Sequence, residues 1–287
     1  MIRTLRPHQW VKNLFVAAPL VFAKHLVDQG YLWRATVAVA AFCALSGAVY
    51  AINDVLDVEA DRAHPNKRNR PIASGALGER AALVLAGLLT TAALSACLAL
   101  SWKCAAWAGG YLAINLAYSL KLKHLAFVDV VLIASGFMAR VAAGGAAIAV
   151  TPSRWLLVCT GLLATFLALG KRAHELALAT RDGRDASATR AALAGYRVGW
   201  VRLAMVALSA ATAAAYIAYT VDPHTVEYFG TRKLPWSAPF CVMGLARFAW
   251  LALVRPGTES PTDAMLRDGV FLMNLVAWGV VILVIVY

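Results

Sequence analysis

Apolar residues run along this chain in long blocks separated by short polar segments. A helix that crosses a membrane needs about 20 mostly apolar residues. Nine blocks approach or exceed that length, at about 11–27, 34–53, 81–101, 105–121, 126–150, 154–171, 198–221, 236–254 and 268–287. The pattern predicts an all-α polytopic membrane protein with nine transmembrane helices. We expect one domain over residues 1–287, with polar loops at about 54–80 and 171–197.

The first block resembles the apolar core of a signal peptide, but further apolar blocks follow it and Pro19 lies inside it. We therefore interpret it as an uncleaved first span.

Composition supports a membrane protein and argues against a nucleic-acid partner. Apolar residues make up 61% of the 287 positions, and the mean hydropathy is +0.67. The net charge of +12 comes from cations in the short loops, where they meet lipid headgroups or phosphorylated substrates. With the N-terminus in the cytoplasm, most of the 27 Lys and Arg residues lie on the cytoplasmic side. We expect an integral protein of the cell (inner or plasma) membrane with both polar loops in the cytoplasm.

Acidic residues gather where the second block ends. Asp54, Asp57 and Asp61 are spaced i, i+3, i+7, so a helix would place them on one face together with Asn53. Three like charges so close require a neutralising cation, and Mg²⁺ accepts oxygen ligands while bridging carboxylates to phosphates. The spacing predicts a Mg²⁺ site at Asp54, Asp57 and Asp61, which we also name as catalytic. The alternative is a solvated acidic helix end.

Cations accompany this motif and recur later in the chain. Lys67 and Arg68 follow it, and Lys171, Arg172 and Glu175 lie at the end of the sixth block. Cations near a metal cluster suit a polyanionic substrate, although basic cytoplasmic loops are also ordinary. Arg140 lies mid-block, where it needs either a structural partner or an anionic substrate group.

The sequence N-D-x-x-D-x-x-x-D, from Asn53 to Asp61, resembles the first signature of the UbiA superfamily of intramembrane prenyltransferases. The resemblance covers nearly the whole chain. It implies helices around a central cavity open to lipid, and Mg²⁺ on the acidic motifs holding a diphosphate.

The second motif departs from the D-x-x-x-D usual in prenyl-transferring members, since Lys171-Arg172-x-x-Glu175 stands there. With Arg6-Pro7-x-x-Trp10-x-Lys12-Asn13, it looks like the polyprenyl-phosphate phosphoribosyltransferase branch. That branch moves 5-phosphoribose from phosphoribosyl diphosphate to a polyprenyl (decaprenyl) phosphate, releases diphosphate, and serves a pathway to arabinose-containing envelope polymers. The expected substrate-binding residues are Asn53, Lys12, Lys67, Arg68, Tyr118, Lys121, Arg140, Lys171, Arg172 and Glu175.

Two other functions fit parts of the sequence. A prenyltransferase would move a polyprenyl group from its diphosphate to an aromatic acceptor. A secondary transporter would use Asp129 and Arg140, but no inverted repeat is visible. The sequence leaves open the lipid length, the number of Mg²⁺ ions, the pathway, the residue that stabilises the transition state, and the oligomeric state, including a homo-oligomer.

Overall fold

The chain divides into two compact helical units. The computed structural model describes residues 2–63, 67–120, 122, 125, 127–181, 193, 195–254 and 260–287. One unit comprises residues 1–120 and 135–152, and the other comprises residues 121–134 and 153–287. The described residues form helices and no strand, as the sequence predicts.

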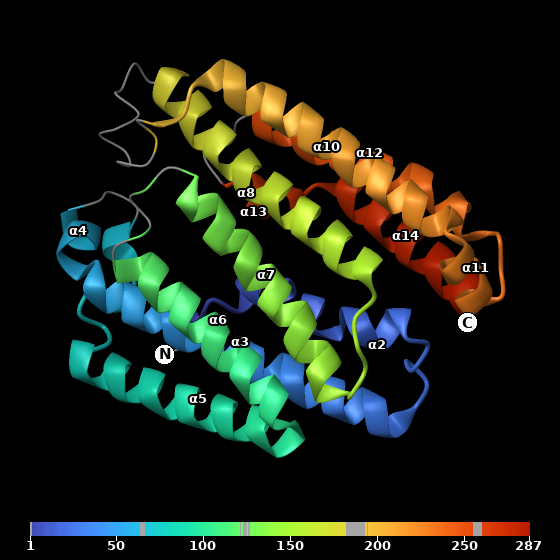
Figure 1. Ribbon diagram of the computed structural model, residues 1–287. Helices are drawn as coiled ribbons and strands as arrows, with labels where there is room; N and C mark the ends of the chain where they lie inside the picture. Colours follow the sequence, from blue (N-terminus) through green and yellow to red (C-terminus); the bar gives the residue numbers. More distant parts are fainter. Residues whose placement is uncertain are drawn as a thin grey trace. The chain divides into compact units, whose positions relative to one another are not determined.

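The first unit is built around one long helix. Its elements in chain order are α1 (Ile2–Leu5), the 3₁₀ helix η1 (Pro7–Ala17), α2 (Ala18–Phe22), α3 (Gln29–Leu56), α4 (Val58–Ala63), the 3₁₀ helix η2 (Lys67–Asn69), α5 (Glu79–Leu100), α6 (Trp102–Leu120) and the later part of α7 (Val128–Ala147). Helix α3 packs against α1, η1, α5 and α6, and Figure 1 shows α3 and α5 side by side.

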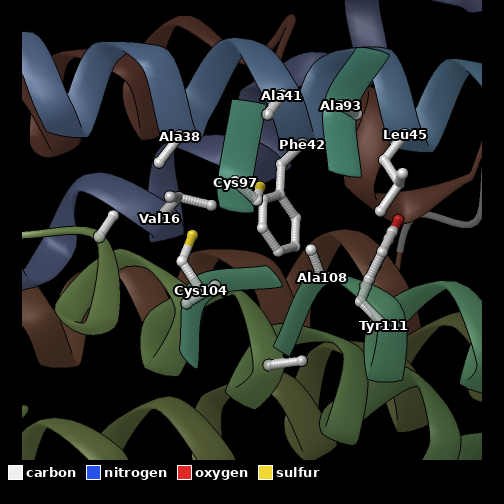
Figure 2. Packing of buried hydrophobic residues seen from close by; sticks show 13 residues of the cluster. Val16, Ala38, Ala41, Phe42, Leu45, Ala93, Cys97, Cys104, Ala108 and Tyr111 are labelled. Carbon is white, nitrogen blue, oxygen red and sulfur yellow. The ribbon is translucent and has the colours of Figure 1, made fainter. Parts of the chain in front are cut away.

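Small residues let these helices approach closely. The core of the first unit joins Ala38 and Phe42 of α3 to Cys97 of α5 and to Ala108 and Tyr111 of α6 (Figure 2). All five are buried. Lipid tails are as apolar as these side chains, so the hydrophobic effect does little to bring helices together inside a bilayer. Close van der Waals packing holds neighbouring helices together there.

The second unit contains the remaining helices. They are the start of α7, α8 (Arg154–Arg181), α10 (Val198–Val221), α11 (Pro223–Phe229), the 3₁₀ helix η5 (Leu234–Ser237), α12 (Ala238–Leu253), α13 (Pro261–Met265) and α14 (Gly269–Val286). Helix α10 packs on α8 and α12, and α12 packs on α14. A buried cluster that includes Phe166 and Phe248 fills this unit.

Seven of the described helices are long and apolar enough to cross a membrane. They are α3, α5, α7, α8, α10, the helical stretch Leu234–Leu253 and α14. The membrane prediction is therefore supported, whereas the count of nine is not confirmed. Helix α6 has 19 residues but falls outside the seven, and its sequence includes Lys103, Asn115 and two glycines.

The predicted first span, 11–27, is also not one α-helix. Residues 7–17 form a 3₁₀ helix that passes into the short α2, with Pro19 at its second position. A 3₁₀ helix of this length is uncommon and needs support from its surroundings. The polar contacts of Asn13 and a close approach to α7 supply that support. At Gly144 of α7, a Cβ atom would lie only 1.8 Å from the Val16 carbonyl oxygen, so only glycine fits there.

Helix α8 continues ten residues beyond the predicted end of the sixth span. It runs to Arg181, so Lys171, Arg172 and Glu175 lie on a helix and not in a loop. The position of each residue around α8 therefore decides its burial: Arg172 is buried, whereas Lys171 and Glu175 are half-buried.

Candidate active site

The acidic motif lies at the junction of α3 and α4 in the first unit. Asp57 occupies the turn between the helices, yet the hydrogen bonds from Asp57 N–H to Asn53 O (2.9 Å) and from Asp61 N–H to Asp57 O (2.8 Å) keep a helical spacing. As a result, Asp54 and Asp61 project to the same place. Each of them is only 2% exposed.

Two arginines neutralise this buried pair of carboxylates. Arg70 Nη1 lies 2.5 Å from Asp61 Oδ2 and 3.1 Å from Asp54 Oδ1, and Arg6 Nη2 lies 2.5 Å from the same Asp54 oxygen. Two carboxylates and two guanidinium groups give the four side chains no net charge. The repulsion that the sequence pattern implies is thus relieved by cations from within the chain.

Arg6 adopts an unusual backbone conformation at this site. Its φ of 50° and ψ of 64° lie in the left-handed region, which is uncommon for a residue with a side chain. Its guanidinium group also lies over the Tyr50 ring, 4.9 Å from the ring centroid. Residues held in sparsely populated conformations cluster at functional sites. The conformation of Arg6 therefore marks it as a candidate functional residue.

The donor set fits a hard divalent cation. Asn53 Oδ1 is a buried amide oxygen with no hydrogen-bond partner in the structure, and it directly precedes Asp54. Carboxylate and amide oxygens are the ligand types that Mg²⁺ accepts. Across the described residues, no three His, Cys, Asp or Glu side chains come together as a metal site. The structure therefore unites two of the three predicted carboxylate ligands, and the role of the half-buried Asp57 stays a prediction.

Arg140 lies in a second polar cluster of the same unit. Its guanidinium group donates to Asn13 Oδ1 (2.8 Å), to the Gly136 carbonyl oxygen (3.0 Å) and to Tyr111 Oη (2.9 Å), and it stacks 4.5 Å from the Tyr111 ring centroid. Asn13 in turn donates to Ser46 Oγ (3.1 Å). No described carboxylate pairs with Arg140, which is only 7% exposed. The sequence allowed either a structural partner or an anionic substrate group for Arg140. The structure shows neutral structural partners.

The third polar cluster belongs to the second unit and surrounds Arg172. This side chain is fully buried, with Nε 3.1 Å from Asp129 Oδ2 and Nη1 in contact with Glu175 Oε2. Tyr196 Oη donates to Asp129 Oδ1 (2.8 Å) and accepts from the Phe127 N–H (2.8 Å). Burial, reinforced by the hydrogen bond to Asp129, raises the pKa of the Tyr196 phenol, so it remains a neutral donor at physiological pH. Arg172 is therefore held as an internal ion pair.

The remaining predicted residues lie on several elements. Lys67 and Arg68 are exposed in η2, Lys12 is half-buried in η1 with Nζ 2.5 Å from Gln9 Oε1, Tyr118 is half-buried near the end of α6, and Lys171 is half-buried on α8. Lys121 lies outside the described residues. The phosphate contacts predicted for these side chains stay predictions.

Four residues that shape these clusters are not among the site residues predicted for the enzyme: Arg6, Arg70, Asp129 and Tyr196. Arg6 entered the sequence analysis only as part of a family motif, and Asp129 only in the transporter alternative. Arg70 and Asp61 are nine positions apart and Arg6 and Asp54 are 48 apart, so their pairing follows from the fold. Arg70 did carry one local signal, because it directly precedes a proline in the loop after the acidic motif.

The structure thus places a buried acidic pair, bridged by arginines, at the end of a long apolar helix. The sequence model of the UbiA prenyltransferase family matches residues 14–276 of this chain. The chain therefore belongs to the UbiA prenyltransferase family and is a membrane transferase.

Several relatives align with nearly the whole chain. A decaprenyl-phosphate phosphoribosyltransferase of Mycolicibacterium smegmatis is 33% identical over 97% of this chain and 89% of its own length. Proteins with the same name from Mycobacterium tuberculosis and Corynebacterium glutamicum are each 34% identical, over 97% and 100% of this chain and 91% and 86% of their own lengths.

Solved structures share the fold at lower identity. A UbiA homolog from Archaeoglobus fulgidus, bound to GPP and Mg²⁺, has a TM-score of 0.72 and 17% identity, over 99% of this chain and 96% of that one. A UbiA homolog from Aeropyrum pernix K1 has a TM-score of 0.66 and 19% identity, over 96% and 97%. These likenesses support the UbiA fold.

Proposed function

We propose that this enzyme transfers 5-phosphoribose from phosphoribosyl diphosphate to a polyprenyl phosphate and releases diphosphate. The observation that carries the proposal is the Asp54–Asp61 pair bridged by Arg70 and joined by Arg6. It combines oxygen ligands for a metal with cations for a diphosphate. The relatives named decaprenyl-phosphate phosphoribosyltransferase suggest which diphosphate and which acceptor are used.

Asp54, Asp61 and Asn53 would hold a Mg²⁺ ion, with Asp57 as a further candidate. When bound, Mg²⁺ would neutralise the charge of the leaving diphosphate. The two arginines are suited to the same anion, because a guanidinium group donates in a planar fork that matches phosphate oxygens. With Mg²⁺ on the carboxylates, Arg6 and Arg70 would be available to the diphosphate.

The reaction itself exchanges one bond at C1 of the ribose. The bond from C1 to the diphosphate oxygen breaks, and its electron pair leaves with diphosphate. A phosphate oxygen of the lipid forms the new bond to C1. This oxygen is anionic at neutral pH, so the enzyme needs no general base, and its main tasks are positioning and charge stabilisation.

The membrane location fits both substrates. A polyprenyl phosphate is held in the bilayer, whereas phosphoribosyl diphosphate is soluble. The excess of Lys and Arg in the loops near the acidic motif favours a cytoplasmic site in the cell membrane, by the positive-inside rule. The active site would then open to the compartment that supplies the soluble donor.

Prenyl transfer to an aromatic acceptor is the alternative function. It is favoured by the likeness to the Archaeoglobus fulgidus homolog solved with GPP and Mg²⁺. Against it, Arg172 and Glu175 stand where a second acidic motif would support another metal, and Arg172 forms an internal ion pair with Asp129.

The proposal is tested with purified enzyme in detergent, supplied with Mg²⁺, phosphoribosyl diphosphate and a long-chain polyprenyl phosphate. We expect a lipid-linked phosphoribose and free diphosphate in equal amounts, detected by mass spectrometry and a diphosphate assay. EDTA should abolish both products, and added Mg²⁺ should restore them. Failure to form the lipid product under any divalent cation would contradict the proposal.

A further inference from the structure

A surface hollow of about 510 Å³ lies in the first unit, apart from the carboxylates of the acidic motif. Its lining residues come from α1, from the last residue of η2 and from the loop after η2: Ile2, Arg3, Asn69, Pro71, Ser74 and Ala76. Its volume lies within the range of small-molecule sites, about 300–1,000 Å³.

The backbone segments that line the hollow also carry the arginines of the acidic centre. Arg3 and Arg6 are linked by a backbone hydrogen bond of 3.4 Å, and Asn69 and Pro71 flank Arg70 in sequence. The loop is folded on itself, since the Ser74 N–H donates to the Arg70 carbonyl oxygen (2.9 Å). A ligand in the hollow would therefore contact the same two segments that neutralise Asp54 and Asp61.

The chemistry of the lining favours a phosphate group. Arg3 supplies an exposed guanidinium group, Asn69 an amide and Ser74 a hydroxyl, and none of the described lining residues carries a carboxylate. Two more exposed cations, Lys67 and Arg68, directly precede Asn69. A phosphate monoester carries up to two negative charges and accepts several hydrogen bonds, which matches such a set of donors.

We propose that this hollow binds the terminal phosphate monoester of a sugar-phosphate donor, with Arg3 as its principal cation. The inference rests on the proposed function, in which the donor carries a diphosphate at one end and a 5-phosphate at the other. It assigns the diphosphate to the acidic centre and the 5-phosphate to the hollow. Arg172 is less suited to that role, because its guanidinium group is fully buried and paired with Asp129.

Inhibition by two half-donors tests this assignment. Ribose 5-phosphate carries only the monoester, and inorganic diphosphate carries only the leaving group. In Arg3→Ala, we expect inhibition by ribose 5-phosphate to weaken about tenfold, with inhibition by diphosphate unchanged, because one charge-assisted contact is lost. The variant Ser74→Ala should show a smaller effect of the same kind. Arg80→Ala is the matched control, since Arg80 is exposed in the first turn of α5 and outside the hollow.

A direct binding measurement tests the phosphate site even if the proposed function is wrong. If the enzyme forms no lipid-linked phosphoribose, titration calorimetry with ribose 5-phosphate still measures the site, and weaker binding by Arg3→Ala than by Arg80→Ala would support it. Equal binding by Arg3→Ala, Arg80→Ala and the unmodified protein would overturn it. A polyprenyl phosphate is also a monoester, so a raised lipid KM with an unchanged donor KM in Arg3→Ala would assign the hollow to the lipid and overturn the proposal as well.

Discussion

Replacing Asp54 or Asp61 by asparagine should lower turnover by at least about a hundredfold. Each substitution removes a carboxylate that we propose as a metal ligand, and it leaves Arg70 with one carboxylate partner where it had two. The neighbouring Asn53 oxygen cannot replace the lost charge. The measurement is the rate of lipid product formation at saturating phosphoribosyl diphosphate over a range of Mg²⁺ concentrations.

Glu59→Gln provides the matched control for these variants. Glu59 lies on α4 beside the motif, but its side chain is 83% exposed and pairs only with the surface residue Arg62 among its described ion pairs. This variant should retain nearly full turnover. The sequence pattern alone suggests that removing a like charge would not harm the apo fold. The ion pairs to Arg6 and Arg70 reverse that expectation, so the Asp54 and Asp61 variants should also melt at lower temperature. Near-normal turnover in both the Asp54 variant and the Asp61 variant would contradict the role of the acidic centre in catalysis.

Asp129→Leu should destabilise the protein by up to about 3–5 kcal/mol, because it leaves the fully buried Arg172 guanidinium group with Glu175 as its one remaining described carboxylate partner. It also removes the acceptor of the Tyr196 hydroxyl. The double variant Asp129→Leu/Arg172→Met should recover most of the loss, since both buried charges are then gone. Thermal unfolding in detergent measures each step.

Lys171→Met is the matched control in this series, because Lys171 is half-buried on the same helix and adjoins Arg172. Its unfolding temperature should change far less than that of Asp129→Leu. The stable double variant then allows the predicted phosphate role of Arg172 to be measured. A raised donor KM in that variant would support direct binding by Arg172. A double variant no more stable than Asp129→Leu would show that the ion pair is not what holds this cluster.

The fold class and the acidic pair followed from local sequence. Long apolar blocks predict membrane helices, and the spacing of Asp54 and Asp61 places them on one face wherever the chain is helical. Both inferences depend only on neighbours a few residues apart. The partners of these carboxylates cannot be predicted from such near neighbours, because Arg6 is 48 residues away from Asp54. The cations close to Arg6 along the chain gave no signal either, since cations are ordinary in a cytoplasmic segment.

Arg140 shows a second limit of sequence reasoning. Its depth in an apolar block correctly indicated that it needs a partner. The partners that the structure supplies, Asn13 and Tyr111, are neutral and lie 127 and 29 residues away. A search of the sequence for a residue of opposite charge therefore could not have found the partners of Arg140.

Helix ends were the least predictable features of the fold. Composition changes at residue 171, but nothing after Gly170 breaks the helix, so α8 continues and buries Arg172. In the predicted first span, the 3₁₀ geometry of residues 7–17 depends on contacts with α3 and α7 that no local pattern encodes.

A competition between two donors measures the proposed chemistry most directly. Purified enzyme with Mg²⁺ receives phosphoribosyl diphosphate with polyprenyl phosphate, and polyprenyl diphosphate with a hydroxybenzoate, all in one reaction. Mass spectrometry then gives the ratio of lipid-linked phosphoribose to prenylated ring. Phosphoribosyl transfer to the lipid phosphate predicts that the first product dominates and that the second stays at the level of an Asp54→Asn control. A prenylated ring as the main product, with no lipid-linked phosphoribose, would contradict it.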